Sequence, residues 1–247
     1  TGTGAAPIVA KAAKDLGALT VAIVTRPFSF EGERRRKNAI EGINALKEVV
    51  DAIIIVSNDK LMMMNGTRPI GEAFAESDRV LAQSVKTITD LIVVPGVINL
   101  DFADVKATLQ DKGLALIGFG TGSGPKKAND AASSALLSPL LEASIHGAHS
   151  IIANVTCGNN VSLDEVKEAI DYITSAAGNT PNIIFGVQEN PELNDQMLIS
   201  IVATEFDNDF DPFEEKTPLV NPLPTPQVEE EVEEDEEDSI LPEFLNK

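Results

Sequence analysis

Cysteine, histidine and tryptophan are nearly absent from this sequence. Its 247 residues include one cysteine, two histidines and no tryptophan. The lone Cys157 excludes an internal disulfide and is typical of a protein from a reducing cytoplasm. His146 and His149 have no cysteine or carboxylate at metal-ligand spacing, so the sequence predicts no metal site.

Basic residues and long apolar runs are also scarce. Lysine and arginine number 19 against 39 aspartates and glutamates, which gives a net charge of −20. A nucleic-acid groove needs a basic footprint, and the only dense basic run is residues 34–37, so we expect no nucleic-acid partner. No apolar stretch approaches the length that spans a bilayer, so direct membrane insertion is not expected either.

The acidic residues gather towards the C-terminus. Residues 205–247 hold 16 acids and two bases, whereas residues 1–204 hold 23 acids and 17 bases. Nine of the ten residues from 229 to 238 are acidic, and their mutual repulsion predicts a disordered linker over residues 207–238. Segment 239–247 then brings four apolar residues. It is either a frayed end or a tethered peptide that folds on a partner.

The first third of the chain alternates between helix and strand patterns. Two β-branched runs, at 19–25 and 52–56, are typical of strands buried on both faces. Helix patterns precede each of them, at 7–16 and 34–49, and the connecting loops are short. This alternation predicts parallel strands in an α/β layer.

A long helix is predicted from residue 70 to residue 94, where Pro95 and Gly96 end it. At about 1.5 Å per residue it is roughly 37 Å long, enough to connect two halves of a protein. We expect its apolar face to pack inward, because the apolar residues follow a 3.6-residue period. That face consists of Ile70, Phe74, Leu81, Val85, Ile88 and Ile92.

The second half is predicted to be α+β. Helix patterns cover residues 126–141 and 163–177. The last two strands are separated only by the loop 188–195, so we expect them to pair as a hairpin. The predicted strands are 114–119, 150–156, 182–187 and 197–203.

Two glycine-rich segments invite a nucleotide-binding interpretation. Segment 1–7 (TGTGAAP) runs into a helix, and glycines there let a backbone approach a phosphate, although many such turns bind nothing. Segment 118–124 has alternating glycines instead of the G-x-G-x-x-G pattern, so we expect a flexible surface loop. The chain contains no Gly-Lys-Ser/Thr of a Walker P-loop.

Several acids could carry chemistry. Asn99 or Asp101 could simply cap a helix over 102–111, with Asp104 in its first turn. The same geometry would keep two carboxylates ionised on one face, where they could orient a water or hold a cation. Phe74 and Asp78, four residues apart, could address one planar ligand, or Phe74 could be core and Asp78 solvent-facing.

Taken together, six segments resemble FtsZ, the bacterial tubulin-like cell-division GTPase. They occur in family order: TGTGAAP at 1–7, VTRPFSFEGERR at 24–35, SNDKL at 57–61, AFAESDRVL at 73–81, NLDFADVK at 99–106 and SPLLE at 138–142. In that family the first motif is GGGTGTG, and this chain starts in its middle. We therefore expect it to be a C-terminal portion of a longer protein.

The resemblance implies a tubulin-like α/β fold. A parallel, Rossmann-like GTPase half, here incomplete, would be joined by a long central helix to an α+β C-terminal domain and then to a disordered acidic tail. The implied domains are a partial GTP-binding domain at 1–69, the central helix and turn at 70–98, the C-terminal domain at 99–206, the linker at 207–238 and a partner-binding peptide at 239–247.

The resemblance also implies roles for individual residues around GTP or GDP and Mg²⁺. The phosphates would be lined by the glycine-rich segment, and the guanine would lie against Phe74 with Asp78 bonding its edge. Asn58 would lie near the ribose. The residues of the phosphate and ribose region would be Thr1, Gly2, Thr3, Glu31 and Arg35.

Hydrolysis is implied to occur between subunits. Asn99, Asp101 and Asp104 match the loop that one subunit inserts into its neighbour's GTP site, where the two aspartates position the attacking water. The implied partners are therefore copies of the same protein in head-to-tail filaments, plus membrane-tethering adaptors and division regulators that bind the C-terminal peptide. The implied location is the cytoplasm at the midcell division site.

Two rival functions remain. A non-catalytic scaffold or capping module could bind filament ends without hydrolysing GTP. A Rossmann-type NAD enzyme would share the fold class, but the missing G-x-G-x-x-G motif argues against it.

Overall fold

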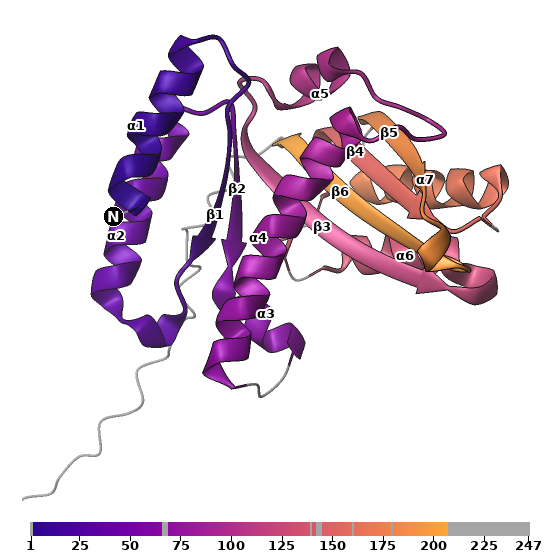
Figure 1. Ribbon diagram of the computed structural model, residues 1–247, viewed down its shortest axis with the longest axis horizontal. Helices are drawn as coiled ribbons and strands as arrows, with labels where there is room; N and C mark the ends of the chain where they lie inside the picture. Colours follow the sequence, from indigo (N-terminus) through magenta and orange to yellow (C-terminus); the bar gives the residue numbers. More distant parts are fainter. Residues whose placement is uncertain are drawn as a thin grey trace, which may run out of the picture. The chain divides into compact units, whose positions relative to one another are not determined.

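The computed structural model describes residues 2–65, 69–138, 140–141, 145–159, 161–178 and 180–206. Their strands form one mixed sheet in the order β1-β2-β3-β6-β4-β5 (Figure 1). Strands β1 to β3 are parallel, β6 is antiparallel to both β3 and β4, and β5 is parallel to β4. The strands are β1 (Val21–Arg26), β2 (Ala52–Ser57), β3 (Gly113–Ser123), β4 (Ala148–Cys157), β5 (Asn182–Glu189) and β6 (Gln196–Phe206).

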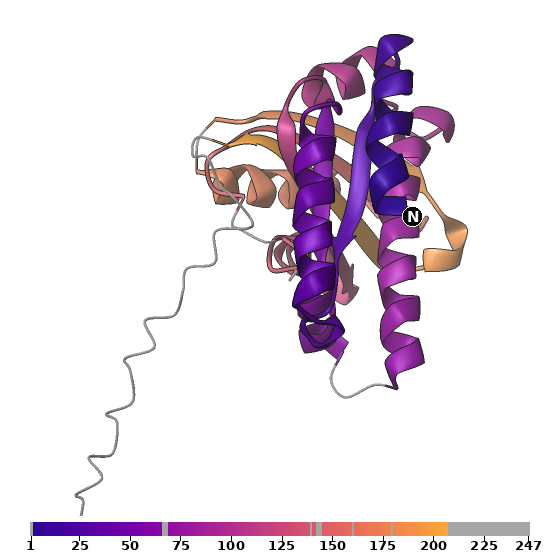
Figure 2. The same cartoon turned by 90° about the vertical axis from the view of Figure 1, so that its left-hand side faces the viewer.

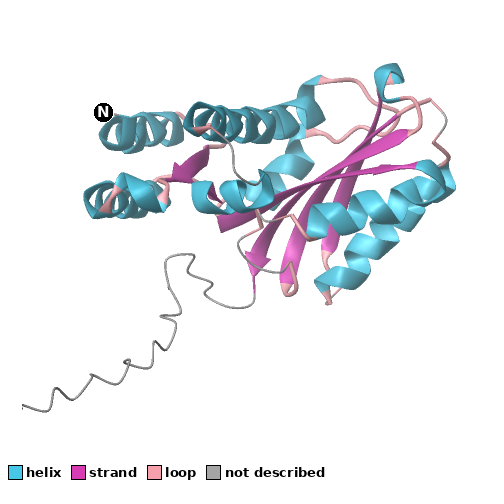
Figure 3. Ribbon diagram, turned by 90° about the horizontal axis from the view of Figure 1, so that it is seen from below, coloured by secondary structure: helices cyan, strands magenta, loops and turns pink. Residues whose placement is uncertain are grey.

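Helices cover both faces of this sheet (Figure 3). One face carries α1 (Gly2–Asp15) and α2 (Glu33–Lys47) over the first strands, and α6 (Lys127–Leu136) and α7 (Leu163–Ala177) over the later ones. The opposite face carries α3 (Asn58–Asn65), α4 (Ile70–Val93) and α5 (Phe102–Leu109). Three short 3-10 turns complete the described elements: η1 (Ser29–Glu31), η2 (Gly124–Lys126) and η3 (Pro191–Leu193).

The alternation of side chains along β2 explains the three layers. Ile53 and Ile55 pack with the cluster under α1 and α2, whereas Ile54 and Val56 pack with the cluster under α4. All six residues of β2 are buried, as predicted for a strand covered on both faces. The six residues of β1 are only half-buried, because β1 is the edge strand of the sheet in the described structure.

The α/β first half, the long central helix and the α+β second half are confirmed. The first-half strands and helix α2 begin and end within two residues of the predicted positions. The predicted linker 207–238 and peptide 239–247 lie outside the described residues. Among the described residues, no helix is long and apolar enough to cross a membrane.

The predicted hairpin of the last two strands is wrong. Strand β6 lies between β3 and β4, and β5 pairs with the far side of β4, so β5 and β6 are not neighbours. The connection through η3 is short, but it crosses the end of β4 rather than folding back as a turn. A short loop between two strands therefore limited their distance without setting which edges pair.

The predicted inward face of α4 is also wrong. The buried residues of this 24-residue helix are Ser77, Val80, Ser84, Thr87 and Leu91, whereas Ile70, Val85 and Ile92 are exposed. Small hydroxyl side chains let a helix lie close to a sheet, and the Ser84 hydroxyl donates to the Val80 carbonyl at 2.7 Å, so it needs no other partner. Periodicity found the helix but not its buried side.

The alternating glycines of segment 118–124 lie mainly in strand β3, not in a flexible loop. A Cβ atom on Gly118, Gly120 or Gly122 would fall 2.4, 2.1 or 2.1 Å from a carbonyl oxygen of α6. Those carbonyls belong to residues four apart along the helix: Ala135, Ala131 and Lys127. The glycines thus form a groove along β3 in which the backbone of α6 rests.

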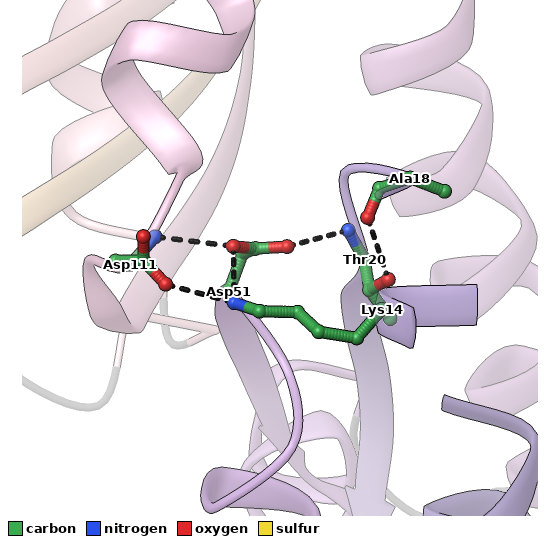
Figure 4. A network of polar contacts seen from close by, with 5 residues as sticks. All are labelled: Lys14, Ala18, Thr20, Asp51 and Asp111. Atoms are coloured by element: carbon green, nitrogen blue, oxygen red, sulfur yellow. Dashed lines mark hydrogen bonds and ion pairs between the residues drawn. The ribbon is translucent and has the colours of Figure 1, made fainter. Parts of the chain in front are cut away.

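The start of β2 holds a hydrogen-bonded network that joins both halves (Figure 4). The buried carboxylate of Asp51 accepts from Lys14 Nζ at 2.6 Å and from the Thr20 amide at 2.8 Å. Lys14 also donates to Asp111 at 2.8 Å, and the Asp51 carbonyl accepts from the amides of Lys112 and Gly113 at 2.9 Å each. Helix α1, strands β1 and β2, and the turn before β3 therefore meet at Asp51.

Hydrogen bonding controls the ionisation of this network. Burial alone would raise the pKa of the Asp51 carboxyl, but the bonds from Lys14 and Thr20 outweigh it and hold that pKa below its ordinary value of 3.8. Its bonds to Asp111 and Asp51 raise the pKa of Lys14. The pair is therefore fully ionised at neutral pH.

Replacing Gly120 with alanine should destabilise the protein by about 1–3 kcal/mol, because the new methyl group would meet backbone atoms of α6 that cannot rotate away. Gly4→Ala is the matched control, since nothing lies within 4 Å of its Cβ position in α1. That change should be neutral or stabilise by up to about 1 kcal/mol. Urea unfolding monitored by circular dichroism measures both, and equal midpoints for the two variants would contradict the close packing.

Asp51→Asn should lower the free energy of unfolding at pH 7 by about 1–3 kcal/mol, because Lys14 and Thr20 lose a charged acceptor. The folded-state pKa lies below the unfolded value, so this contribution is complete above the unfolded pKa and is lost as the pH falls through the folded one. The gap between wild type and variant should therefore close only below about pH 4. A gap that closes near neutral pH would rule out this origin.

Candidate functional site

The loop that follows β1 and the helix α3 that follows β2 meet at the carboxyl ends of these parallel strands, where ligands of open α/β sheets bind. The Ser29 amide, after β1, donates to the Asp59 carboxylate, after β2, at 2.9 Å. Glu31 accepts from the Phe28 amide at 3.0 Å and pairs with Arg35 at 3.0 Å. Glu31 therefore holds the loop and presents the exposed Arg35 guanidinium beside it.

An aromatic cluster supports this loop. Phe28 is fully buried, and its ring stacks on Phe30 and meets the ring of Phe74 edge-on, with both centroid distances at 5.1 Å. Phe74 comes from the N-terminal half of α4 and remains 40% exposed. It therefore has a supported position and a free face, which a planar ligand could cover.

Asn58 is brought to the same place by the end of β2. Its side chain is buried, and its Oδ1 accepts from the Ser77 hydroxyl of α4 at 2.8 Å. Asp78, which follows Ser77 in α4, is exposed to solvent. The structure thus gathers four of the expected nucleotide residues: Glu31, Arg35, Asn58 and Phe74, with Asp78 one helical turn from Phe74.

Sequence reasoning missed three supporting residues here. Phe28 could have been found from its place two residues before Phe30, which makes an aromatic pair in the predicted loop. Asp59 lies in the first turn of α3, directly after β2, but nothing in the pattern pointed it towards Ser29. Ser77 gave no signal, because its partner Asn58 is 19 residues away and only the packing of α4 brings them together.

The described part of the glycine-rich segment 1–7 does not lie beside these residues. Gly2, Thr3 and Gly4 lie in the first turn of helix α1 and not in a loop, and Thr1 lies outside the described residues. Thr3 packs beside Gly42, well inside α2, and Figure 1 shows the N-terminus about halfway along that helix. Gly2 and Thr3 are therefore apart from the residues expected to hold the guanine and ribose.

The segment that carries Asn99, Asp101 and Asp104, called the acidic loop below, follows the C-terminal end of α4 and runs into the first turn of α5. Asp101 is the N-cap of α5, and its Oδ1 accepts from the Asp104 amide at 2.8 Å. The Asn99 side chain stays within the loop, where its Oδ1 accepts from the Gly96 amide at 2.6 Å. Helix capping thus accounts for the position of Asp101, while both aspartates remain exposed at the tip of the loop.

The two groups are far apart in one chain. Fifteen residues of helix separate Asp78 from the end of α4 at Val93, which is about 22 Å at 1.5 Å per residue. Figure 2 shows α4 as one uninterrupted helix. The acidic loop therefore cannot act on a ligand bound beside Phe74 of its own chain.

Two cavities lie elsewhere. One, of about 630 Å³, runs between α6 and α7 and is lined by Leu136, Leu137 and Tyr172 among others. The other, of about 380 Å³, lies between α4 and the later strands and includes Thr87 and Asn154. Neither is lined by a residue expected to bind nucleotide.

Two protein-family models match the chain. Residues 1–66 match the GTPase domain of the Tubulin/FtsZ family, and residues 113–207 match the C-terminal domain of the FtsZ family. The second match begins with β3 and ends at the close of β6, so it coincides with the second half of the sheet.

Solved structures give the same result. An empty FtsZ dimer from M. jannaschii is 40% identical with a TM-score of 0.79, over 83% of this chain and 60% of that one. A mutant FtsZ from the same organism matches equally, over 62% of its length. CetZ1 from Haloferax volcanii, in a GDP-bound monomer, shares the fold at 17% identity and a TM-score of 0.67, over 86% of this chain and 63% of that one.

This chain spans about three-fifths of the length of the FtsZ structures it matches. The two domain matches follow one another in the order of the predicted motifs, and the identity extends across both halves of the described fold. The chain therefore belongs to the FtsZ family of tubulin-like proteins.

Proposed function

We propose that this chain is part of a self-assembling, GTP-dependent cytoskeletal protein that builds the cell-division ring. GTP binds beside the loop after β1 and the start of α3, and hydrolysis is completed by the acidic loop of the next subunit. The observation that carries this proposal is the separation of the two groups by the length of α4. The similarity to an FtsZ solved as a dimer supports it.

On the nucleotide side, each residue has a chemical task. The free face of Phe74 covers the guanine ring, and the Asp78 carboxylate accepts from the ring N–H and amino group, which an adenine does not offer in that arrangement. Asn58 lies near the ribose. Arg35, held by Glu31, supplies positive charge towards the phosphates, with Thr1, Gly2 and Thr3 as the remaining phosphate contacts.

On the acidic side, Asp101 and Asp104 orient a water molecule for attack on the γ-phosphorus of the neighbour's GTP. The bond from that phosphorus to the β-phosphate oxygen breaks, which releases GDP and inorganic phosphate. When bound together with the triphosphate, Mg²⁺ would neutralise part of the phosphate charge.

The domain assignment and the tail belong to the same proposal. Residues 1–69 are a partial GTP-binding domain, 70–98 the central helix and turn, and 99–206 the C-terminal domain. The acidic linker 207–238 then gives peptide 239–247 the reach to dock on a membrane-tethering adaptor or division regulator. The filament assembles in the cytoplasm at midcell.

The isolated chain should bind GTP more weakly than micromolar. Its guanine- and ribose-side residues lie on α4 and after the ends of β1 and β2, whereas Thr3 lies beside Gly42 in α2, so the triphosphate has no complete cradle. Isothermal titration with GTP and Mg²⁺ measures this directly. Saturable binding at micromolar GTP would show that the described groups suffice.

The acidic side should work in trans. The receptor is M. jannaschii FtsZ with the two residues that align with Asp101 and Asp104 changed to alanine, which should leave it able to hold GTP but not to turn it over. Adding the 247-residue chain should restore phosphate release, because its Asp101 and Asp104 complete the receptor's site.

Two variants of the chain separate chemistry from capping. Asp101→Ser keeps an N-cap oxygen for α5 but removes the charge, and Asp104→Ala removes the second carboxylate. Each should lower the restored turnover by about 100-fold, while Asp130→Ala, an exposed acid on α6, should not. A chain that binds the receptor yet restores no turnover would instead be the scaffold or capping module.

A further inference from the structure

The acidic loop is fastened to the edge strand β5. Ile98, three residues before Asp101, exchanges two hydrogen bonds with Val187. The Ile98 amide donates to the Val187 carbonyl at 3.2 Å, and the Val187 amide donates to the Ile98 carbonyl at 2.9 Å. Both polar groups of Val187 thus face the loop, so the pairing of β5 with β4 relies on other residues.

Two further contacts hold the same segment. Gln188 Nε2 donates to the Asp90 carbonyl in the last turn of α4 at 3.0 Å. The Asn99 side chain accepts from the Gly96 amide at 2.6 Å, which closes the loop on itself. The end of α4, the loop and β5 therefore form one hydrogen-bonded unit directly before Asp101.

Gly96 makes this contact possible. A Cβ atom at Gly96 would lie 2.4 Å from the Val187 carbonyl oxygen and 3.2 Å from its carbon. These are backbone atoms of a strand paired along its whole length with β4, so they cannot move aside. Any side chain at residue 96 must lift the loop away from β5.

Resting on the proposed function, we propose that Gly96 and Gln188 are positioning residues for hydrolysis, because together they fix the acidic loop to β5. They touch neither nucleotide nor water. They set where Asp101 and Asp104 stand relative to the neighbouring subunit. Asn99 acts in the same way, through its bond to Gly96.

The physical reason is that Asp101 lies on the connection between α4 and α5, and Asp104 lies in the first turn of α5, directly after that connection. Asp101 only caps α5, a helix of eight residues. A loop between two helices would be free to move by several ångströms, and a displacement of about 1 Å can cost about 100-fold in rate. Attachment to a strand of the sheet removes that freedom.

The test uses Gly96→Ala in the 247-residue chain, with Gly71→Ala as the matched control. Nothing lies within 4 Å of the Cβ position at Gly71, at the far end of α4. Gln188→Met is the second variant, since it removes the donor to Asp90 and keeps the side-chain length. Circular dichroism and urea unfolding first establish that each variant is folded.

Two readouts follow. Amide hydrogen exchange reports the Val187–Ile98 pair, because the Val187 amide should be protected in the wild type and in Gly71→Ala and should exchange faster in Gly96→Ala. Restored phosphate release from the acid-less M. jannaschii FtsZ receptor should fall about 100-fold at saturation with Gly96→Ala. The chain concentration for half-saturation should change by less than about threefold, because docking contacts remain. Gln188→Met should follow the same direction in both readouts.

Each outcome is decisive. Faster Val187 exchange with a lower saturating rate and retained docking supports the positioning role. Faster exchange with an unchanged rate overturns it and leaves the proposed function intact. Unchanged Val187 exchange in Gly96→Ala overturns the attachment itself. If the wild-type chain restores no turnover at all, the proposed function fails and the positioning role fails with it.

Discussion

The close contact between α4 and the sheet sets the distance between every other functional feature of this chain. Its buried seam is built from serine and threonine as much as from aliphatic side chains, and Ser84 satisfies its hydroxyl within the helix. A helix held this closely cannot tilt or slide without losing that packing. Asp78 and the C-terminal end of α4 at Val93 are therefore kept about 22 Å apart as a fixed property of the fold.

The same helix needs fixed attachments at both ends, and the described structure provides them differently. At its N-terminal half, Ser77 reaches Asn58 and Phe74 meets Phe28, so side chains tie it to the start of α3 and to the loop after β1. At its C-terminal end, the backbone pairing of Ile98 with Val187 of β5 and the hydrogen bond from the Gln188 side chain to the Asp90 carbonyl hold the helix in place. Between the halves of the sheet, Asp51 and Lys14 join the starts of β1, β2 and β3, where β2 and β3 share only three register pairs.

The sequence predicted what depends on local periodicity. β-branched runs and capped helices fall where expected because their patterns describe the element itself, as for the strand at 52–56 and the helix at 163–177. The predictions were wrong where the role of a residue depends on the distant segment that packs against it. Apolar residues of α4 such as Val85 stay exposed because small residues lie at the contact. The glycines of β3 were predicted to form a loop. They are needed because the backbone of α6 packs against them, and no local sequence pattern indicates that contact.

The candidate site divides in the same way. Residues such as Glu31 and Asp78 could be predicted because motifs place them at strand ends or on a helix face, and the fold then brings most of them together. The supporting residues could not, since Ser77 and Gly96 matter only through partners 19 and 91 residues away. Asp101 illustrates a further limit, because capping accounts for its position in the sequence whether or not it has a second task.

In the proposed function, division of the reaction between chains follows from this geometry. Direct action on the γ-phosphate requires approach within about 3 Å, and one chain keeps its acids on the far side of a rigid helix from its guanine-side residues. A neighbour stacked in the same orientation would remove that distance, because its acidic loop would meet the open nucleotide face. Such a contact would join two different surfaces, so each added subunit would present a free surface of either kind, and growth would continue as a filament. Hydrolysis would then depend on the joining of a subunit, which would couple the chemistry to assembly and not to nucleotide binding alone.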